Sequence, residues 1–159
     1  MKISVVIPTL NSEKTIGITV KSALSVTDEV IVVDSFSSDR TVEIAEKEGA
    51  RVLQLRGSRL IARIEGAKVA SGDYVVNLDS DMYFSENFKG FEEKVIALGE
   101  ITVGKGVVHK LMSMDRRITH KKWAENLSVS NGGIIPRMYD RQLLLKAYEM
   151  IPYKLERQA

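Results

Sequence analysis

Short apolar runs alternate with helical stripes of apolar residues along the first half of the chain. Runs rich in β-branched residues predict strands at Ile3–Ile7, Val30–Val33, Val52–Leu55 and Tyr74–Leu78. Between them, apolar residues at helical spacing predict one helix with Ile16, Val20, Ala23 and Leu24, a second with Val42, Ile44 and Ala45, and a third with Leu60, Ile61, Ile64 and Ala67. Because the strands show no polar alternation, we expect them to be buried on both faces, as in a parallel sheet.

The ends of these elements carry their own signals. Pro8 is expected to stop the first strand, since proline lacks a backbone donor. Asn11 or Ser12 can cap the first helix, and Asp39 can cap the second, which should end at Gly49.

The second half of the chain is less regular. We expect a helix over Glu86–Leu98, a strand over Ile101–Val108, a loop at Gly132–Ile135 that enters a strand, and a last helix over Arg141–Met150. No repeat or linker separates the halves. The sequence therefore predicts a single α/β domain over 1–159, with a mainly parallel central sheet flanked by helices.

Composition narrows the function. The chain has 159 residues, 44% of them hydrophobic and 28% charged, with a net charge of +2. This charge is too small for a nucleic-acid footprint, so we expect no nucleic-acid partner. Cysteine is absent, which excludes disulfides, cysteine zinc sites and a thiol nucleophile. No apolar run approaches the ~20 residues that span a bilayer, and no signal peptide is recognisable. We expect a soluble, cytoplasmic protein.

Polar residues follow three of the predicted strands, at Pro8–Asn11, Asp34–Ser35 and Asp79–Asp81. Ligands of open α/β sheets bind beyond the carboxyl ends of the strands. Asp79 and Asp81 form a D-x-D pair of hard oxygen ligands, which suits Mg²⁺ or Mn²⁺ and would neutralise a departing diphosphate. The alternative is a loop with two solvated acids. Asp34 could accept hydrogen bonds from a base or ribose, or could simply form an Asx-turn.

Other polar residues allow two interpretations each. Arg59 and Arg63 lie one turn apart and could meet phosphates, or belong to a solvated helix face. His109 and His120 lack a metal-binding spacing and are interpreted as structural or surface residues. The Lys121–Trp123 cluster could touch a membrane surface or an acceptor, although a solvated helix end beside a core tryptophan is the commoner arrangement.

Several enzyme classes are disfavoured by missing motifs. No G-x-G-x-x-G follows the first strand, so a dinucleotide oxidoreductase is disfavoured. The sequence contains no Walker A motif, no G-x-S-x-G elbow and no H-E-x-x-H. The nearest alternative enzyme class is a nucleotidyltransferase, which can use a related sheet and metal site. Such enzymes normally need a glycine-rich phosphate loop after the first strand, and Pro8–Glu13 contains no glycine.

Taken together, these segments resemble the family 2 glycosyltransferases, which have the GT-A fold. The resemblance covers roughly residues 1–90 and is carried by Val5–Glu13, Ile31–Thr41, Arg63 with Gly66-Ala67 and Ala70–Tyr74, and the D-x-D in Leu78–Asp81. A weaker match covers Pro136-Arg137 and Tyr139–Arg141, which look like the acceptor-side strand and helix of the family.

The resemblance implies an inverting transfer of a sugar from a nucleoside-diphosphate sugar, first of all a UDP-sugar, to a hydroxyl of a glycan, lipid or protein acceptor. Residues 1–90 would bind the nucleotide-sugar and a Mn²⁺ or Mg²⁺ ion, and residues 91–159 would form the acceptor side. Asp34 would contact the base, and Arg63 the base or the diphosphate. The implied donor-binding residues are Pro8, Thr9, Asn11, Glu13, Asp34, Arg63, Asp79 and Ser80, and the implied metal ligands are Asp79 and Asp81.

The sequence departs from the family pattern at Ser35, Ile64 and Met82, which replace polar or acidic residues. No Q-x-x-R-W segment is present, which disfavours a processive polysaccharide synthase.

An inverting transferase needs a carboxylate base on the acceptor side. Asp140 reads as a helix cap and Glu149 as a solvated helix residue, so Glu156 is the nominal catalytic base. The alternative is that the chain ends before the base, which would leave a non-catalytic nucleotide-sugar-binding module.

Overall fold

The computed structural model describes residues 2–84 and 138–150. All of the described residues belong to one compact unit of the chain. The elements predicted over 86–98, 101–108 and 132–135 lie outside the described residues. So do His109, His120, the Lys121–Trp123 cluster, Pro136-Arg137 and Glu156.

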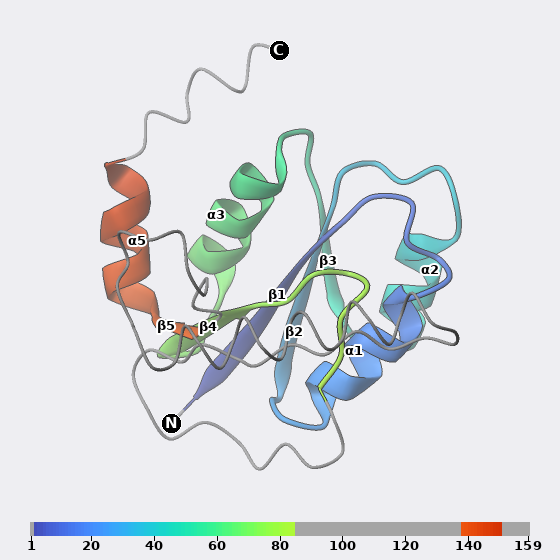
Figure 1. The fold of residues 1–159 in the computed structure, drawn as a ribbon, viewed down its shortest axis with the longest axis horizontal. Coiled ribbons are helices and arrows are strands. Elements are labelled where there is room, and N and C mark those ends of the chain that lie inside the picture. Colours follow the sequence, from blue (N-terminus) through green and yellow to red (C-terminus); the bar gives the residue numbers. More distant parts are fainter. Residues whose placement is uncertain (1, 85–137, 151–159) are drawn as a thin grey trace, which may run out of the picture. The chain divides into compact units, whose positions relative to one another are not determined.

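The described residues form a five-stranded sheet in the order β3-β2-β1-β4-β5 (Figure 1). The strands β1 to β4 run parallel, and β5 is antiparallel to β4, with Tyr74 opposite Asp140. The predicted mainly parallel sheet with flanking helices is therefore confirmed. The elements are β1 Ile3–Thr9, α1 Ile16–Leu24, β2 Glu29–Asp34, α2 Thr41–Lys47, β3 Arg51–Gln54, α3 Arg59–Val69, β4 Tyr74–Asn77, β5 Met138–Asp140 and α5 Arg141–Glu149.

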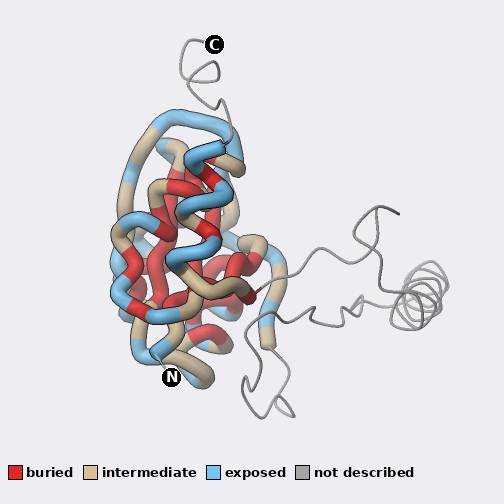
Figure 2. The backbone as a smooth tube through the Cα atoms, turned by 90° about the vertical axis from the view of Figure 1, so that its left-hand side faces the viewer, coloured by how far each residue is buried: buried red, intermediate tan, exposed pale blue. Residues whose placement is uncertain are grey.

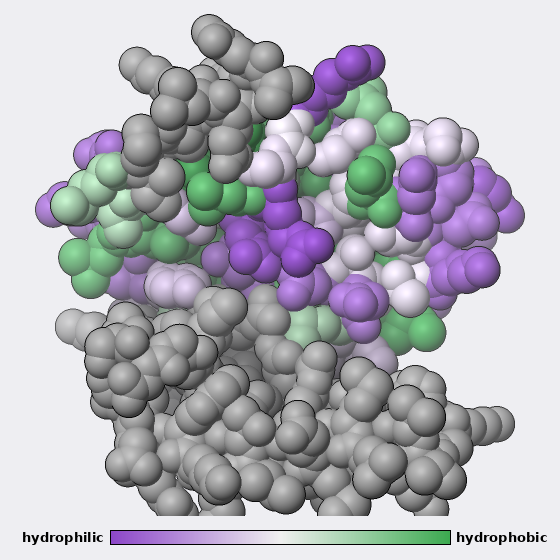
Figure 3. Space-filling model, turned by 45° about the horizontal axis from the view of Figure 1, so that its top comes forward, coloured by the Kyte–Doolittle hydropathy of each residue, from purple (hydrophilic) through white to green (hydrophobic). Residues whose placement is uncertain are grey.

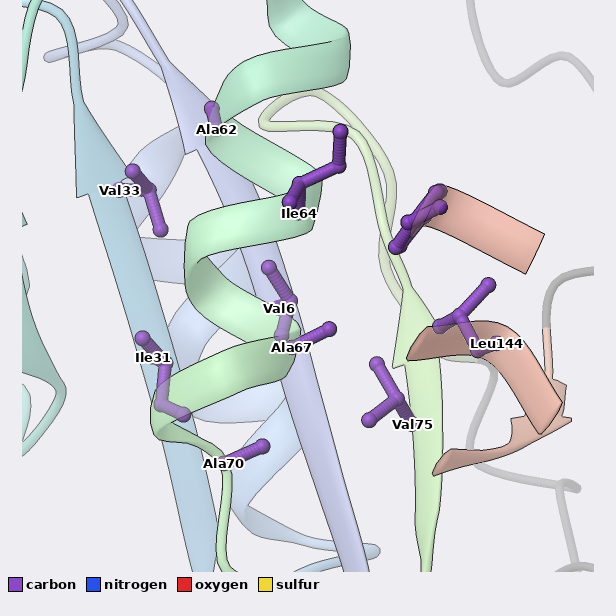
Figure 4. Close-up of a cluster of buried hydrophobic side chains, with 10 residues drawn as sticks. Val6, Ile31, Val33, Ala62, Ile64, Ala67, Ala70, Val75 and Leu144 are labelled. Atoms are coloured by element: carbon purple, nitrogen blue, oxygen red, sulfur yellow. The ribbon is translucent and has the colours of Figure 1, made fainter. Parts of the chain in front are cut away.

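The helices cover both faces of the sheet. In Figure 1, α3 and α5 lie on one side of the strands, and α1 and α2 lie on the other. The central strands β1 and β2 are buried along almost their whole length, as expected for strands without polar alternation. Figure 2 shows the buried residues, in red, gathered inside the described part of the chain. On the α3 side, Figure 4 shows apolar side chains from the strands meeting those of the helices; the cluster comprises Val6, Ile31, Val33, Ala62, Ile64, Ala67, Ala70, Val75, Leu144 and Tyr148.

The close packing of α3 on the sheet depends on Gly66. A Cβ atom added at this position would lie 2.3 Å from Cγ1 of Val6 and 3.1 Å from Cγ2 of Val33. No real side chain tolerates the shorter of these contacts, so only glycine lets the helix approach β1 so closely.

The first strand is longer than predicted, because β1 continues through Pro8 to Thr9. Along a parallel strand, alternate residues bond to opposite neighbours. The carbonyl of Val6 accepts from Leu78 on the β4 side, so Pro8 also faces that side. The pairing of β1 with β4 ends at Val6, opposite Asn77. The missing N–H of Pro8 therefore costs no ladder hydrogen bond, and the proline is compatible with the strand.

The predicted caps had mixed outcomes. The N-cap of α1 is Thr15, which makes no side-chain cap bond, so the expected cap at Asn11 or Ser12 was wrong. The carboxylate of Asp39 does accept the backbone N–H of Thr41, the first residue of α2, from just before the cap position. Gly49, with φ of 99°, follows the end of α2 as predicted.

The carboxyl-terminal helix is tied to the end of α3. Asp140 caps α5 by accepting from the N–H of Leu143 at 3.0 Å. The guanidinium of Arg141 donates to the carbonyl oxygens of Ala67 at 3.1 Å and Lys68 at 3.2 Å, at the carboxyl end of α3. A cation at this end also opposes the negative pole of the helix dipole. Thus β5 and α5, which we placed in an acceptor-side half, complete the layer around α3.

Among the described helices, none has the length and apolar character needed to cross a membrane.

Candidate functional site

A cleft of about 840 Å³ opens at the carboxyl ends of the strands, between the loops that follow β1, β2, β3 and β4. Figure 3 shows hydrophilic side chains gathered in the middle of the face obtained by turning the top of Figure 1 forward. The cleft is lined by Pro8, Thr9, Leu10, Asn11, Ser12, Glu13, Lys14, Thr15, Ser35, Asp39, Gly57, Arg59, Asp79, Ser80 and Asp81. Most of the predicted donor-binding residues and both predicted metal ligands are therefore brought together.

Two of the lining loops brace each other through reciprocal hydrogen bonds. The side-chain oxygen of Asn11 accepts the backbone N–H of Ser38 at 2.9 Å. Likewise, Glu13 accepts the N–H of Arg40 at 3.2 Å, while the carboxylate of Asp39 accepts the N–H of Glu13 at 3.1 Å. The side chains of Asn11 and Glu13 therefore hold the loop after β1 against the loop after β2.

Asp34 lies under the cleft and not in its wall. Its side chain is completely buried and accepts hydrogen bonds from Thr9, from the backbone N–H and hydroxyl of Ser37, and from Gln54 at 3.1 Å. Burial alone would raise the pKa of this carboxyl, but the bonds from Ser37, Gln54 and Thr9 outweigh it and hold the pKa below its usual range. In this geometry a base contact by Asp34 would require the loop to rearrange, whereas its neighbour Ser35 lines the cleft.

The D-x-D segment follows β4 and is held on two sides. Nη2 of Arg63, on α3, lies 2.7 Å from Oδ1 of Asp79, and both side chains are mostly shielded from solvent. The hydroxyl of Ser80 lies 2.9 Å from that of Ser12 in the loop after β1. Arg63 does not belong to the described residues that line the cleft, and it contacts the site through Asp79.

Behind Asp79, polar side chains of α3, β4 and α5 are largely buried together. Asn77 and Tyr148 are both buried, and burial raises the pKa of the Tyr148 hydroxyl, with Asn77 and the charge of Arg63 acting in the opposite direction. Nε of Arg63 and Oδ1 of Asn77 are buried, and neither atom has a hydrogen-bond partner among residues 2–84 and 138–150. The guanidinium of Arg63 is therefore held mainly by its charge-assisted contact with the carboxylate of Asp79.

The carboxylates of the cleft fit a divalent cation only in part. Within residues 2–84 and 138–150, no group of three or more acidic, histidine or cysteine side chains is placed to hold a metal. Asp79 and Asp81 alone would supply hard oxygen ligands on one side of an ion. This matches Mg²⁺ or Mn²⁺, which keep waters and substrate phosphates as their remaining ligands.

Several lining residues were not among the predicted donor-binding residues. Lys14 and Arg59 add positive charge, while Leu10, Ser12, Thr15, Ser35, Asp39 and Gly57 complete the walls. Arg59 and Ser35 carried a signal, since the former is a cation at a helix start and the latter follows a strand-end acid. Leu10, Ser12 and Asp39 lie inside the segments that carry the family resemblance. Lys14, Thr15 and Gly57 lie outside them and could be found only from the way the loops fold over each other.

Sequence comparison decides the family. The model of the family described as "Glycosyl transferase family 2" matches residues 4–145. The chain belongs to glycosyl transferase family 2. This match extends well beyond residues 1–90, which carried the resemblance, and it includes β5 and most of α5. Together with the sheet topology, membership of glycosyl transferase family 2 confirms the predicted GT-A fold class.

Relatives within glycosyl transferase family 2 match part of their length. An uncharacterised glycosyltransferase of Rickettsia conorii is 37% identical over 97 residues, which cover 60% of this chain and 34% of the relative. A poly(ribitol-phosphate) beta-N-acetylglucosaminyltransferase of Staphylococcus aureus is 38% identical over 100 residues, covering 54% and 17%. The glucosyl-3-phosphoglycerate synthase of Petrotoga mobilis is 49% identical over 59 residues, covering 33% and 18%. The chain thus spans about a third of the first of these relatives, and less of the others.

Solved structures include similar chains. The glucosyl-3-phosphoglycerate synthase of Mycobacterium tuberculosis is 37% identical, with a TM-score of 0.48 over 52% of this chain and 35% of that chain. The same synthase in complex with Mg²⁺ and UDP is 37% identical, with a TM-score of 0.47, and covers 50% and 33%.

Proposed function

We propose that the cleft binds a nucleoside-diphosphate sugar, with UDP-sugars as the first candidates, and that the protein transfers the sugar to an acceptor hydroxyl with inversion. One observation carries the proposal. In a chain of glycosyl transferase family 2, the Asp79-Ser80-Asp81 segment lies at the end of β4 in a cleft walled by the loops after β1 and β2. Polar strand ends at this edge of a parallel sheet are where open α/β domains bind ligands.

The nucleotide would be held by walls of different chemistry. We assign Pro8, Thr9 and Ser35 to the side that receives the base, because they lie at the ends of β1 and β2. Lys14 and Arg59 are exposed cations on the cleft wall and suit the diphosphate. In this arrangement Asp34 supports the base side from within by fixing Thr9 and the turn at Ser37.

Asp79 and Asp81 would hold Mn²⁺ or Mg²⁺ on the diphosphate side. When bound, such an ion neutralises charge on the leaving nucleoside diphosphate. Arg63 would orient Asp79 through the contact at 2.7 Å.

The proposed transfer is a single displacement. The acceptor oxygen bonds to the anomeric carbon of the sugar as the bond from that carbon to the diphosphate breaks, and the electron pair leaves with the nucleoside diphosphate. The proton of the acceptor hydroxyl passes to a carboxylate, for which Glu156 stays our candidate. The acceptor class stays open between glycan, lipid and protein. A composition without cysteine is compatible with a cytoplasmic location, which we also propose.

The test is calorimetric titration of the full chain with UDP-, GDP- and dTDP-sugars, each with Mn²⁺ and again with a chelator. We expect one nucleotide class to bind, and Mn²⁺ to tighten that binding. Failure of all three classes to bind would overturn the proposed donor site. Equal affinity with Mn²⁺ and with chelator would overturn the metal role alone.

A non-catalytic binding module is the second candidate. It is favoured because the acids in the described cleft already make other contacts. Glu13 and Asp39 bind backbone N–H groups, and Asp79 pairs with Arg63. With Asp81 assigned to the metal, the described cleft offers no further carboxylate as a base. Transfer of radiolabelled sugar from the bound donor to any acceptor, or to water, separates the two candidates, since a module would bind without turnover.

A further inference from the structure

A buried hydroxyl on α1 contacts the backbone of the D-x-D segment. The side chain of Thr19 is 1% exposed, and its Oγ1 lies 2.9 Å from the carbonyl oxygen of Ser80. The same Oγ1 lies 3.2 Å from the carbonyl oxygen of Thr15, one turn earlier in the helix. A hydroxyl has a single proton to donate. The shorter distance indicates that the bond to Ser80 is the one that Thr19 makes.

Two further hydroxyl groups attach the same segment to the region around α1. The Ser80 and Ser12 hydroxyls lie 2.9 Å apart. Past the D-x-D, Oγ of Ser22 accepts the backbone N–H of Phe84 at 3.2 Å and donates to the carbonyl of Thr19 at 2.9 Å. The chain from Ser80 to Phe84 is therefore fixed by side chains that belong to the region from Ser12 to Ser22, far away in the sequence.

The two carboxylates of the D-x-D are held in different ways. Asp79 is fixed through its side chain by Arg63. Asp81 is exposed, and within the described part of the chain no hydrogen bond or ion pair holds its carboxylate. The position of Asp81 therefore depends on the backbone turn that contains it, which is closed by the N–H of Met82 donating to the carbonyl of Asp79 at 3.0 Å. Thr19 is the buried side chain that ties this turn, at Ser80, to α1.

We propose that Thr19 is a positioning residue for the metal site, whose hydroxyl fixes the carbonyl of Ser80 so that Asp79 and Asp81 face the same cation. Metal-binding constellations need ligands fixed to within about 0.5 Å by residues around them. The bond from Thr19 supplies this restraint to Asp81, whose own side chain is not held by any described residue. The inference rests on the proposed function, because it assigns Thr19 a role toward a cation held by Asp79 and Asp81.

The test compares Thr19→Val, which keeps the shape and removes the donor, with Thr19→Ser, which restores it. UDP affinity is measured by calorimetry on the full chain, with Mn²⁺ and with chelator. In Thr19→Val, we expect the factor by which Mn²⁺ tightens UDP binding to be about fivefold smaller, which is the effect of losing one typical hydrogen bond. The affinity for UDP without metal should stay unchanged. Thr19→Ser should recover the gain to within about twofold of the natural chain on the same scale. The electron paramagnetic resonance spectrum of bound Mn²⁺ should broaden in Thr19→Val only.

Ser25→Ala is the matched control. Ser25 is the exposed C-cap residue of α1, and its hydroxyl donates back to the carbonyl of Ser22 at 2.7 Å, away from the D-x-D segment. The Ser25→Ala variant should therefore keep the Mn²⁺ gain. An unchanged gain and spectrum in a folded Thr19→Val variant would overturn the inference. If Thr19→Val does not fold, Ser22→Ala decides, because it releases Phe84 from the same helix and should also reduce the gain. Absence of any Mn²⁺ gain in the natural chain would instead count against the proposed function.

Discussion

Adjacent residues at the strand ends serve different purposes in this site. Asp34 is completely buried and binds Thr9, Ser37 and Gln54, whereas Ser35 lines the cleft. Successive side chains of an extended chain point in opposite directions, so only one of two neighbours can face a ligand. The sequence could predict that polar residues gather here. It could not predict which neighbour faces outward, because that depends on the direction of each side chain at the strand end.

Asp34 is expected to contribute to stability in a pH-dependent way. Replacing it as Asp34→Asn removes the charge and leaves fewer acceptor positions for its buried donors, so the free energy of unfolding at pH 7 should fall by about 2 kcal/mol. The pKa of Asp34 is lower in the folded than in the unfolded state. Its contribution to stability is therefore complete at pH values above the unfolded-state pKa and is lost as the pH falls from there through the folded-state pKa. Denaturant titrations of both proteins from pH 7 to pH 3 should therefore converge at the acid end.

The exposed acid Asp28, between α1 and β2, provides the control for this comparison. Asp28→Asn should match the natural chain throughout the pH range. If Asp34→Asn lost UDP affinity while its stability stayed unchanged, Asp34 would be a ligand-binding residue after all, and the supporting role would be wrong.

Asp81 is the residue on which the metal role depends most directly. Asp81→Ala should leave UDP affinity in chelator unchanged, because no other described side chain relies on it. The gain from Mn²⁺ should fall about tenfold or more, since a contact that involves a charged group contributes about 1.5–3 kcal/mol. Calorimetry with and without Mn²⁺ measures both quantities. Glu46→Gln, an exposed acid on α2 outside the cleft, should change neither.

At the scale of elements, the pattern of apolar residues was sufficient to predict β1 to β4 and α1 to α3. Their β-branched runs and helical stripes fill both faces of the sheet. The cluster around Val6 and Ile64 fills the α3 side, and Val5 and Ile7 on the same strand are equally buried. The ends of elements were predicted less well. β1 continues through Pro8 because its pairing with β4 has already ended while its pairing with β2 goes on. Asn11 bonds to the loop after β2 and does not cap α1. Such outcomes depend on neighbours that are remote in sequence.

The packing of α3 on the sheet should be sensitive to a single methyl group. Gly66→Ala would place a Cβ atom 2.3 Å from Val6, so the helix must shift away from β1. Overpacking of this kind typically costs about 1–3 kcal/mol, and the better helix propensity of alanine recovers at most ~1 kcal/mol. Gly17→Ala, on α1, is the matched comparison, since its added Cβ would lie at a milder 3.2 Å from Ile44. Denaturant unfolding should rank Gly66→Ala clearly below Gly17→Ala, and equal stability of the two variants would contradict the packing argument.

At the scale of the whole molecule, the family could be predicted because its motifs are local in sequence. Strand-end segments such as Pro8–Asn11 and Asp79–Asp81 converge through the topology of a parallel sheet alone. A strand and helix around Tyr139–Arg141 were expected from the resemblance, but the place of this strand in the sheet was not. Antiparallel pairing of β5 with β4 sets Tyr74 opposite Asp140 across a long intervening segment, and α5 then packs on α3.

The catalytic base is the largest question at this scale, because the acids of the described cleft already hold loops or pair with Arg63, and Asp81 is proposed for the metal. Asp140 is confirmed as the cap of α5 and is thereby occupied. Glu156, which lies outside the described residues, stays the predicted base. Glu156→Gln keeps the shape of the side chain and removes its basicity, so turnover should fall by ~10²-fold or more while donor affinity is retained. Glu149→Gln, on the exposed side of α5, should leave turnover unchanged. Transfer at the natural rate by Glu156→Gln would eliminate this residue, and tight donor binding without transfer by the natural chain would mean that the base is not in this chain.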